Sequence, residues 1–182
     1  MGRIAESELI INGDGSIFHL HIRPEDLADT VMLVGDPGRV DMVASFFDEI
    51  EVNKSSREFH TITGKYNGKR ISVISTGIGC DNIDIVVNEL DALKNIDFAT
   101  REEKSEKTTL NILRVGTSGA IQPEISLGSF VLSHYSVGFD ALLNWYGGRE
   151  EIADAVIERD FLTHMGEEWC TKKLPVPYFV KA

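Results

Sequence analysis

The sequence predicts an α/β protein in which helices cover a mixed β-sheet. Three observations predict this class. Short apolar runs of the kind found in buried strands alternate with segments of helical periodicity. The pair Asn67-Gly68 separates two strand-like segments and indicates a hairpin, so the sheet is not purely parallel. Several strand-like segments end in glycine-rich turns, which is typical of α/β sheets that bind ligands at the carboxyl ends of their strands.

Length and composition indicate a globular chain of ordinary domain size. It has 182 residues, of which 42% are apolar. The formal net charge of -11 argues against a general affinity for nucleic acid but allows one small anion held by a few arginines. Cys80 and Cys170 form no Cys-x-x-Cys pair, and no apolar run has the length of a signal or membrane segment. We therefore expect a soluble, cytoplasmic protein without disulfides.

The first strand and helix are predicted from a short segment. Residues 31–35 are an apolar run, typical of a buried strand. Asp36 is suited to cap the next helix, and Pro37 to occupy its first position. A helix over residues 38–49 follows from the apolar positions Val40, Val43, Ala44 and Phe47.

The middle of the chain predicts a hairpin and a second helix. The hairpin strands cover residues 59–66 and 70–79. Residues 81–95 predict a helix capped by Asp81 or Asn82. Its apolar face consists of Ile83, Val86, Val87, Leu90 and Leu93. Residues 97–110 have mixed charge and little periodicity, so we expect an exposed loop or helix extension.

The last third of the chain has a weaker pattern. Strands are expected within residues 110–120 and 128–138, a loop or short helix over 140–148, and one helix within 150–166. Residues 175–182 look like the beginning of a strand.

Two arginines lie beside glycine turns at the ends of predicted strands. The turn from Gly35 to Arg39 suits a phosphate at a helix N-terminus, or a tight turn with a solvated arginine. Arg114 lies in an apolar strand, so it either pairs with a carboxylate or points at an anionic ligand. Thr117 and Ser118 then add hydroxyl groups beside it.

Other motifs give less specific indications. Arg57 is interpreted as a surface arginine. His19 and His21 would point to the same side of a strand and suggest a metal, but no third ligand lies nearby, so no metal site is predicted. The segment from Thr76 to Asn82 resembles a dinucleotide fingerprint without its last glycine.

Taken together, the motifs resemble those of the nucleoside phosphorylase family. The segments IFHL, GDPGR, SSREF, STGIG and LRVGTSGAIQP occur in the family's order between Phe18 and Val137. The residues in these segments favour the uridine phosphorylase branch over the purine nucleoside phosphorylases, in which the motifs follow the same order. The resemblance implies a nucleoside phosphorylase-like fold, a three-layer αβα arrangement with a mixed, barrel-like central sheet flanked by helices.

The resemblance also assigns site residues. It implies phosphate binding by Gly35, Arg39, Arg114 and Thr117, with Arg57 supplied by a neighbouring subunit. His19 would cross the same interface to bond the ribose 5′-hydroxyl, and Ser118 and Gly119 would lie near the base.

The activity implied is pyrimidine nucleoside salvage by a pentosyltransferase, which converts uridine, and also deoxyuridine, with phosphate into uracil and the sugar 1-phosphate. No metal or organic cofactor is expected, because inorganic phosphate is the co-substrate. The expected assembly is a homodimer or larger oligomer, such as a hexamer, with shared sites. The alternatives are a purine nucleoside phosphorylase or nucleosidase of the same fold, or a truncated non-catalytic relative.

The resemblance raises a question of completeness. We expect residues 1–182 to form one nucleoside phosphorylase-like domain that lacks its C-terminal part. In the family, residues beyond the position of Ala182 would recognise the base and hold the ribose hydroxyls. The segment of residues 98–109 is longer than the matching segment of compact family members, and no role is predicted for it.

Overall fold

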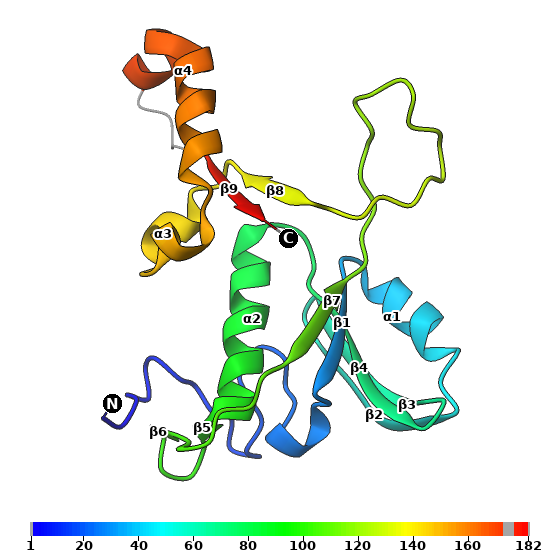
Figure 1. The fold of residues 1–182 in the computed structure, drawn as a ribbon. Helices are drawn as coiled ribbons and strands as arrows, with labels where there is room; N and C mark the ends of the chain where they lie inside the picture. The colour runs from blue at the N-terminus through cyan, green and yellow to red at the C-terminus, as the bar shows by residue number, and fades with distance from the viewer. Residues whose placement is uncertain (1, 173–176, 182) are drawn as a thin grey trace. The chain divides into compact units, whose positions relative to one another are not determined.

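The computed structural model of the chain describes residues 2–172 and 177–181. It contains two compact units, which divide after Ser118 and which we describe separately. Figure 1 shows the first unit in blue to green and the second in yellow-green to red. The elements of the first unit are, in order, a 3₁₀ turn Pro24–Asp26, β1 Thr30–Val34, α1 Pro37–Ala44, β2 Glu49–Ser56, β3 Phe59–Tyr66, β4 Lys69–Ser75, α2 Cys80–Asn95, β5 Ile96–Asp97, β6 Glu102–Glu103 and β7 Asn111–Arg114.

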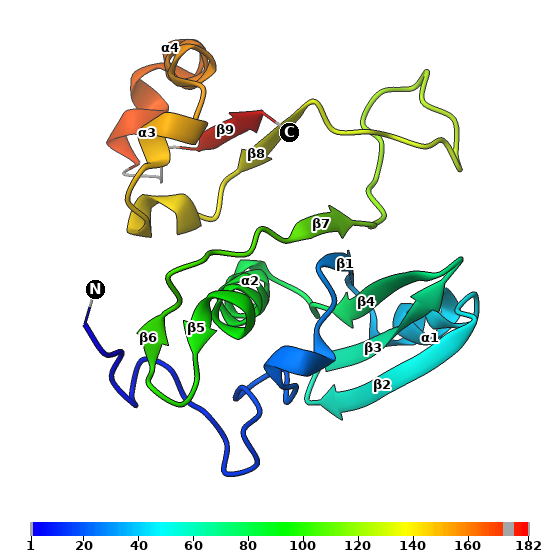
Figure 2. The same cartoon turned by 60° about the horizontal axis from the view of Figure 1, so that its bottom comes forward.

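The central sheet is mixed, as predicted. Its strand order is β2-β3-β4-β1-β7. Strand β1 is parallel to both β4 and β7, whereas β3 is antiparallel to β2 and β4. Figure 2 shows the antiparallel strands β2, β3 and β4 side by side. The sheet is not closed in the described residues, since β2 and β7 are its edges, so the barrel-like closure expected from the resemblance is not seen.

Two helices cover the two faces of this sheet and produce the predicted three layers. Alternate residues of a strand point to opposite faces. In β1, Val31 and Leu33 pack in a core cluster with α2, whereas Val34 packs with α1 in a second cluster. Helices α1 and α2 therefore lie on opposite sides of β1 (Figure 1).

Helix α1 begins as the sequence predicts and ends earlier. The backbone N–H of Gly38 donates to Asp36 Oδ1 at 2.6 Å, and Pro37 occupies the first turn. The helix ends at Ala44 instead of continuing to residue 49. The chain turns there, and the N–H of Asp48 donates to Lys65 O, which begins the pairing with β3.

The hairpin forms as predicted, and it has an additional neighbour. Asn67 and Gly68 both have positive φ, 50° and 74°, which is the type I′ turn that suits the twist of hairpin strands. Strand β2 was not predicted, because its residues are mostly exposed and polar and alternate with apolar residues only over Glu49–Val52. It forms because it pairs along β3.

Helix α2 has the predicted extent but differs in detail. Val86, Leu90 and Leu93 are fully buried in the core. Val87 is 42% exposed, so its assignment to the apolar face was wrong. The helix cap is Gly79, without a side-chain cap, instead of Asp81 or Asn82. The predicted loop after the helix contains the short ribbon β5–β6.

The second unit pairs two short strands beside helices. Its elements are β8 Tyr135–Gly138, a 3₁₀ turn Leu142–Trp145, α3 Arg149–Ile152, α4 Ala155–Thr171 and β9 Tyr178–Lys181. Strand β8 covers only the end of the predicted strand 128–138, and it is antiparallel to β9. The predicted last strand is present from Tyr178, while residues 175, 176 and 182 lie outside the described residues. No helix in the described part of the chain has both the length and the apolar character needed to cross a membrane.

Candidate functional site

A cavity of about 710 Å³ lies where three parallel strands end. Because β4, β1 and β7 are adjacent and parallel, their carboxyl ends meet at one edge of the sheet. Gly35 follows β1, Gly77 follows β4 and Gly116 follows β7, and all three line the cavity. This is the position in which α/β sheets bind ligands.

Four of the predicted phosphate-binding residues line this cavity together. They are Gly35, Arg39, Arg114 and Thr117, which come from the turn after β1, the first turn of α1, the end of β7 and the turn after it. The other lining residues are Asp36, Pro37, Glu58, Gly77, Ile78, Gly79, Asn82 and Gly116. Residues as far apart in the sequence as Gly35 and Thr117 thus share one concave surface.

Two of the glycines allow side chains to approach the backbone closely. A Cβ on Gly116 would lie 2.6 Å from Nη1 of Arg114, so the guanidinium group occupies the space left by the missing side chain. Gly77 has a φ of 68°, and a Cβ there would lie 2.7 Å from Nδ2 of Asn82 and 2.9 Å from Cγ of Glu58. The glycine turns therefore shape the cavity wall.

The predicted phosphate-binding arginines lack carboxylate partners within the described residues. Arg39, Arg57 and Arg114 make no ion pair there. By contrast, Arg3, Arg70, Arg149 and Arg159 each lie within ion-pair distance of a carboxylate. Arg114 is exposed at the end of the edge strand β7, so the carboxylate pairing that the sequence left open is not seen among the described residues. Its guanidinium group remains available for an anion.

The first backbone N–H groups of α1 donate to Asp36. The N–H of Gly38 donates to the Asp36 carboxylate, and the N–H of Arg39 donates to Asp36 O at 3.1 Å. The Asp36 side chain thus binds the backbone, as its role as N-cap predicts. On this side of the cavity, the hydrogen-bond donors without a partner among the described residues belong to the Arg39 side chain and not to the first backbone amides of α1.

Arg57 and His19 lie elsewhere on the first unit. Arg57 follows β2 with a φ of 56°, and its guanidinium carbon lies 5.4 Å from the ring centroid of Phe18. His19 is next to Phe18, with ring centroids 4.8 Å apart. Neither residue lines the cavity of Arg39 and Arg114. One chain therefore does not bring all three predicted phosphate-binding arginines together.

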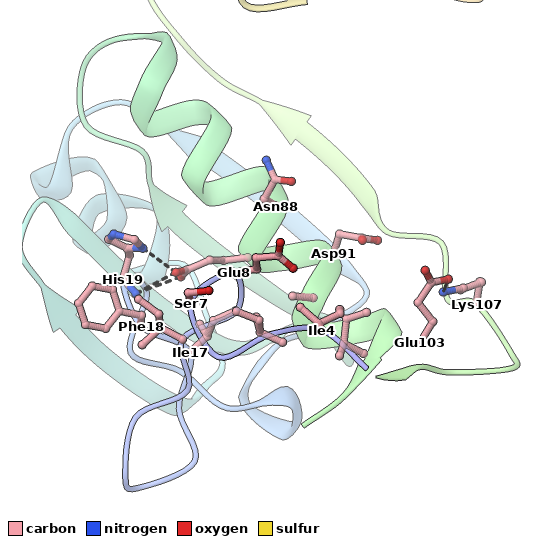
Figure 3. Close-up of a pocket in the computed structure, with 15 residues that line it drawn as sticks. Ile4, Ser7, Glu8, Ile17, Phe18, His19, Asn88, Asp91, Glu103 and Lys107 are labelled. Carbon is pink, nitrogen blue, oxygen red and sulfur yellow. Dashed lines mark hydrogen bonds and ion pairs between the residues drawn. The ribbon is translucent and has the colours of Figure 1, made fainter. Parts of the chain in front are cut away.

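His19 lines a second cavity, of about 570 Å³, between the N-terminal segment and α2 (Figure 3). Nδ1 of His19 lies 2.7 Å from Oε1 of Glu89 on α2. The dashed lines that leave His19 in Figure 3 mark its contacts in this cavity. The cavity also has an apolar floor that includes Ile4 and Ile17. His19 is thereby tied to the helix that covers the sheet.

The histidine pair does not lie on a strand. Residues 18–22 form turns and irregular structure, and His21 has a φ of 56°. His19 contacts Glu89, whereas Nε2 of His21 lies 3.9 Å from Asp14. The expectation that both rings share one face was therefore wrong. Within the described residues, no three histidine, cysteine or acidic side chains are grouped so that they could hold a metal.

Ser118 and Gly119 lie at the division between the two units. Both are exposed, and neither lines the cavity of Arg39 and Arg114. Their predicted position near the base stays a prediction.

Sequence reasoning missed three side chains that lie at these cavities. Glu58 follows Arg57 directly in the SSREF segment, and Asn82 ends the incomplete dinucleotide fingerprint, so both had a local signal. Glu89 had none, because its partner His19 is 70 positions away.

The comparisons with known proteins identify the family. The chain belongs to the Phosphorylase superfamily, whose family model matches residues 29–178, and this confirms the resemblance to nucleoside phosphorylases. The uridine phosphorylase of Thermococcus kodakarensis is 36% identical over 145 residues. A purine nucleoside phosphorylase of the DeoD type from Alkaliphilus metalliredigens is 33% identical over 162 residues. These alignments cover 80% and 81% of this chain and 47% and 64% of the two relatives.

A solved structure agrees with this assignment. The nucleoside phosphorylase of Trypanosoma brucei, described as showing uridine phosphorylase activity, matches with a TM-score of 0.80 and 28% sequence identity. The match covers 96% of this chain and 57% of that one. The chain thus spans between about half and two thirds of the length of these relatives.

Proposed function

We propose that this protein takes part in the phosphorolysis of uridine, with deoxyuridine as a second substrate, to give uracil and the corresponding sugar 1-phosphate. One observation carries the proposal. Arg39 and Arg114, which lack carboxylate partners among the described residues, share a cavity at the carboxyl ends of three parallel strands. A cavity with two available guanidinium groups suits a phosphate ion.

Phosphate would be the nucleophile at C1′ of the ribose. It carries roughly −1.5 to −2 charge near pH 7. The planar forks of Arg39 and Arg114 match its oxygens, and Thr117 adds a hydroxyl. Breaking the glycosidic bond gives the sugar cation-like character, which a bound phosphate stabilises while it lies in position to attack. The proposed reaction needs no metal or organic cofactor.

The third arginine would come from a second copy of the chain. Arg57 and His19 lie together beside Phe18 and outside the cavity of Arg39 and Arg114. In the proposed dimer, Arg57 reaches the phosphate of the neighbouring site, and His19 bonds the ribose 5′-hydroxyl there. A hexamer built from such dimers keeps the same shared sites.

Subunit complementation tests the shared site. Arg57→Ala and Arg114→Ala proteins should each be nearly inactive alone. Mixed dimers contain one site with both arginines, so random mixing should restore about a quarter of the original activity in a symmetric dimer. If mixing after dissociation and reassociation restores nothing, Arg57 does not act across an interface.

A purine nucleoside phosphorylase is the second candidate, because a purine-specific relative aligns over as much of this chain as the uridine phosphorylase does. The experiment incubates the protein with phosphate and either uridine or inosine, and follows release of the free base. Uracil release that requires phosphate supports the proposal, whereas hypoxanthine release alone favours the purine activity. Base release without phosphate would indicate a nucleosidase, and no release from either nucleoside would overturn the proposed phosphorolysis.

A further inference from the structure

The carboxylate of Glu89 collects hydrogen bonds from two successive residues of a distant loop. Its Oε1 accepts from the backbone N–H of His19 at 2.9 Å and lies 2.7 Å from Nδ1 of the same residue. Its Oε2 accepts from the backbone N–H of Leu20 at 2.9 Å. The Glu89 and His19 side chains are only 12% and 27% exposed. One carboxylate from α2 therefore fixes both the backbone and the ring of His19.

This arrangement determines which ring nitrogen of His19 carries the proton. The backbone N–H groups of His19 and Leu20 can only donate, so both carboxylate oxygens act as acceptors. An ionised carboxylate has no hydrogen to offer, so Nδ1 must be the donor in the short contact to Oε1. In a neutral imidazole the other nitrogen, Nε2, then has a lone pair and accepts hydrogen bonds.

Two aromatic rings also pack against the ring of His19, and Nε2 of this ring is available to a ligand. His19 meets Phe18 and Phe59 edge-on, with centroid distances of 4.8 and 6.3 Å, and Phe59 is 1% exposed. Within residues 2–172 and 177–181, no group forms a hydrogen bond with Nε2. The same Phe18 contacts Arg57. His19 and Arg57, which are both proposed to reach the neighbouring site, therefore pack against the same ring.

We propose that Glu89 is a positioning residue that holds His19 as the Nδ1–H tautomer, so that Nε2 accepts a hydrogen bond from the 5′-hydroxyl of a nucleoside. The tautomer follows from the contacts of Glu89 alone. The step to the 5′-hydroxyl rests on the proposed function. The consequence is a preference for nucleosides that carry the 5′-hydroxyl over 5′-deoxynucleosides, which lack the donor.

The tautomer is tested on the unmodified protein, without turnover. Long-range ¹H–¹⁵N correlation spectra distinguish a protonated from an unprotonated imidazole nitrogen, and a His19→Gln variant identifies the His19 signals among the five histidines. The expected result at neutral pH is a proton on Nδ1 and a lone pair on Nε2. A protonated Nε2 with an unprotonated Nδ1 would overturn the proposal, whatever activity the protein has.

The role in substrate choice is tested by comparing uridine with 5′-deoxyuridine. Replacing Glu89 with alanine should lower the ratio of the two kcat/KM values about three- to tenfold, which is the effect of losing one hydrogen bond. A purely structural loss would lower both values and leave their ratio unchanged. Glu8→Ala is the matched control, because Glu8 lines the same cavity and forms no hydrogen bond with His19.

A double-mutant cycle separates this role from others. If Glu89 acts through His19, the Glu89→Ala change should have no further effect on the ratio in a His19→Ala protein. Additive effects of the two changes would overturn the proposal. Absence of phosphorolysis in the unmodified protein would refute the proposed function instead, and the spectra would still decide the tautomer.

Discussion

Replacing Gly116 with alanine should weaken phosphate binding without unfolding the protein. A Cβ at this position would lie 2.6 Å from Nη1 and 3.8 Å from Cζ of Arg114, with no other atom within 4 Å outside the adjoining residues. Ordinary contact begins at 3.4 Å, so the guanidinium group must move by about 0.8 Å. Because this group is the end of a flexible side chain, it can move at little cost. Alanine also restricts the unfolded chain, which adds about 0.4–1 kcal/mol of stability where the backbone accepts it.

The expected loss of affinity follows from the bond that the moved guanidinium can no longer make. A hydrogen bond involving a charged group contributes about 1.5–3 kcal/mol, so phosphate should bind roughly 10- to 150-fold more weakly. Isothermal titration calorimetry with inorganic phosphate measures the affinity, and thermal unfolding measures the stability. Gly119→Ala is the control, because nothing lies within 4 Å of a Cβ there. Unchanged phosphate affinity in Gly116→Ala would refute the argument that the position of Arg114 matters.

Three further changes test the fold. Leu90→Ala should lower the free energy of unfolding by about 2–5 kcal/mol in chemical denaturation, because Leu90 is fully buried between α2 and the sheet. Arg70 donates to Glu51 at 2.6 Å and lowers the pKa of that carboxyl below its ordinary 4.5. Arg70→Gln should therefore reduce stability most above about pH 4.5, and the difference from the unmodified protein should shrink as the pH falls below that value. A part that does not depend on pH should remain, because Arg70 also donates to backbone carbonyls such as Leu27 O. Asp36→Ala should cost about 1 kcal/mol by removing the cap of α1, yet preserve or improve phosphate affinity, because a negative charge leaves the cavity wall.

The parts of the fold that the sequence predicted depend on local physical chemistry. Asp36 followed by Pro37 begins a helix because both residues satisfy or remove donors that the first turn leaves unpaired. Asn67-Gly68 produces a hairpin because both residues tolerate positive φ. Neither signal needs contacts from a distant part of the chain.

The elements that were missed depend on distant partners. Strand β2 is mostly polar and exposed, so its conformation is determined by hydrogen bonding to β3 and not by its own pattern. Val87 lies at helical spacing from buried residues, but the buried stripe of α2 is narrower than the apolar stripe in its sequence. The length of α1 was overestimated because residues after Ala44 continue its apolar pattern while the chain turns toward β3.

The two cavities differ in how much of their arrangement could be predicted from local sequence patterns. The residues around Arg39 and Arg114 follow strand ends, and parallel neighbouring strands necessarily bring such turns to one edge. Their convergence could therefore be expected once the strands and the order of the turns were recognised. The pairing of His19 with Glu89 follows from no such rule, since it joins an irregular N-terminal loop to the middle of α2. From the sequence alone, a carboxylate at a helical position is interpreted as a solvated charge. Only the packing of the loop against α2 makes Glu89 the acceptor for two backbone N–H groups and brings it into contact with the His19 ring.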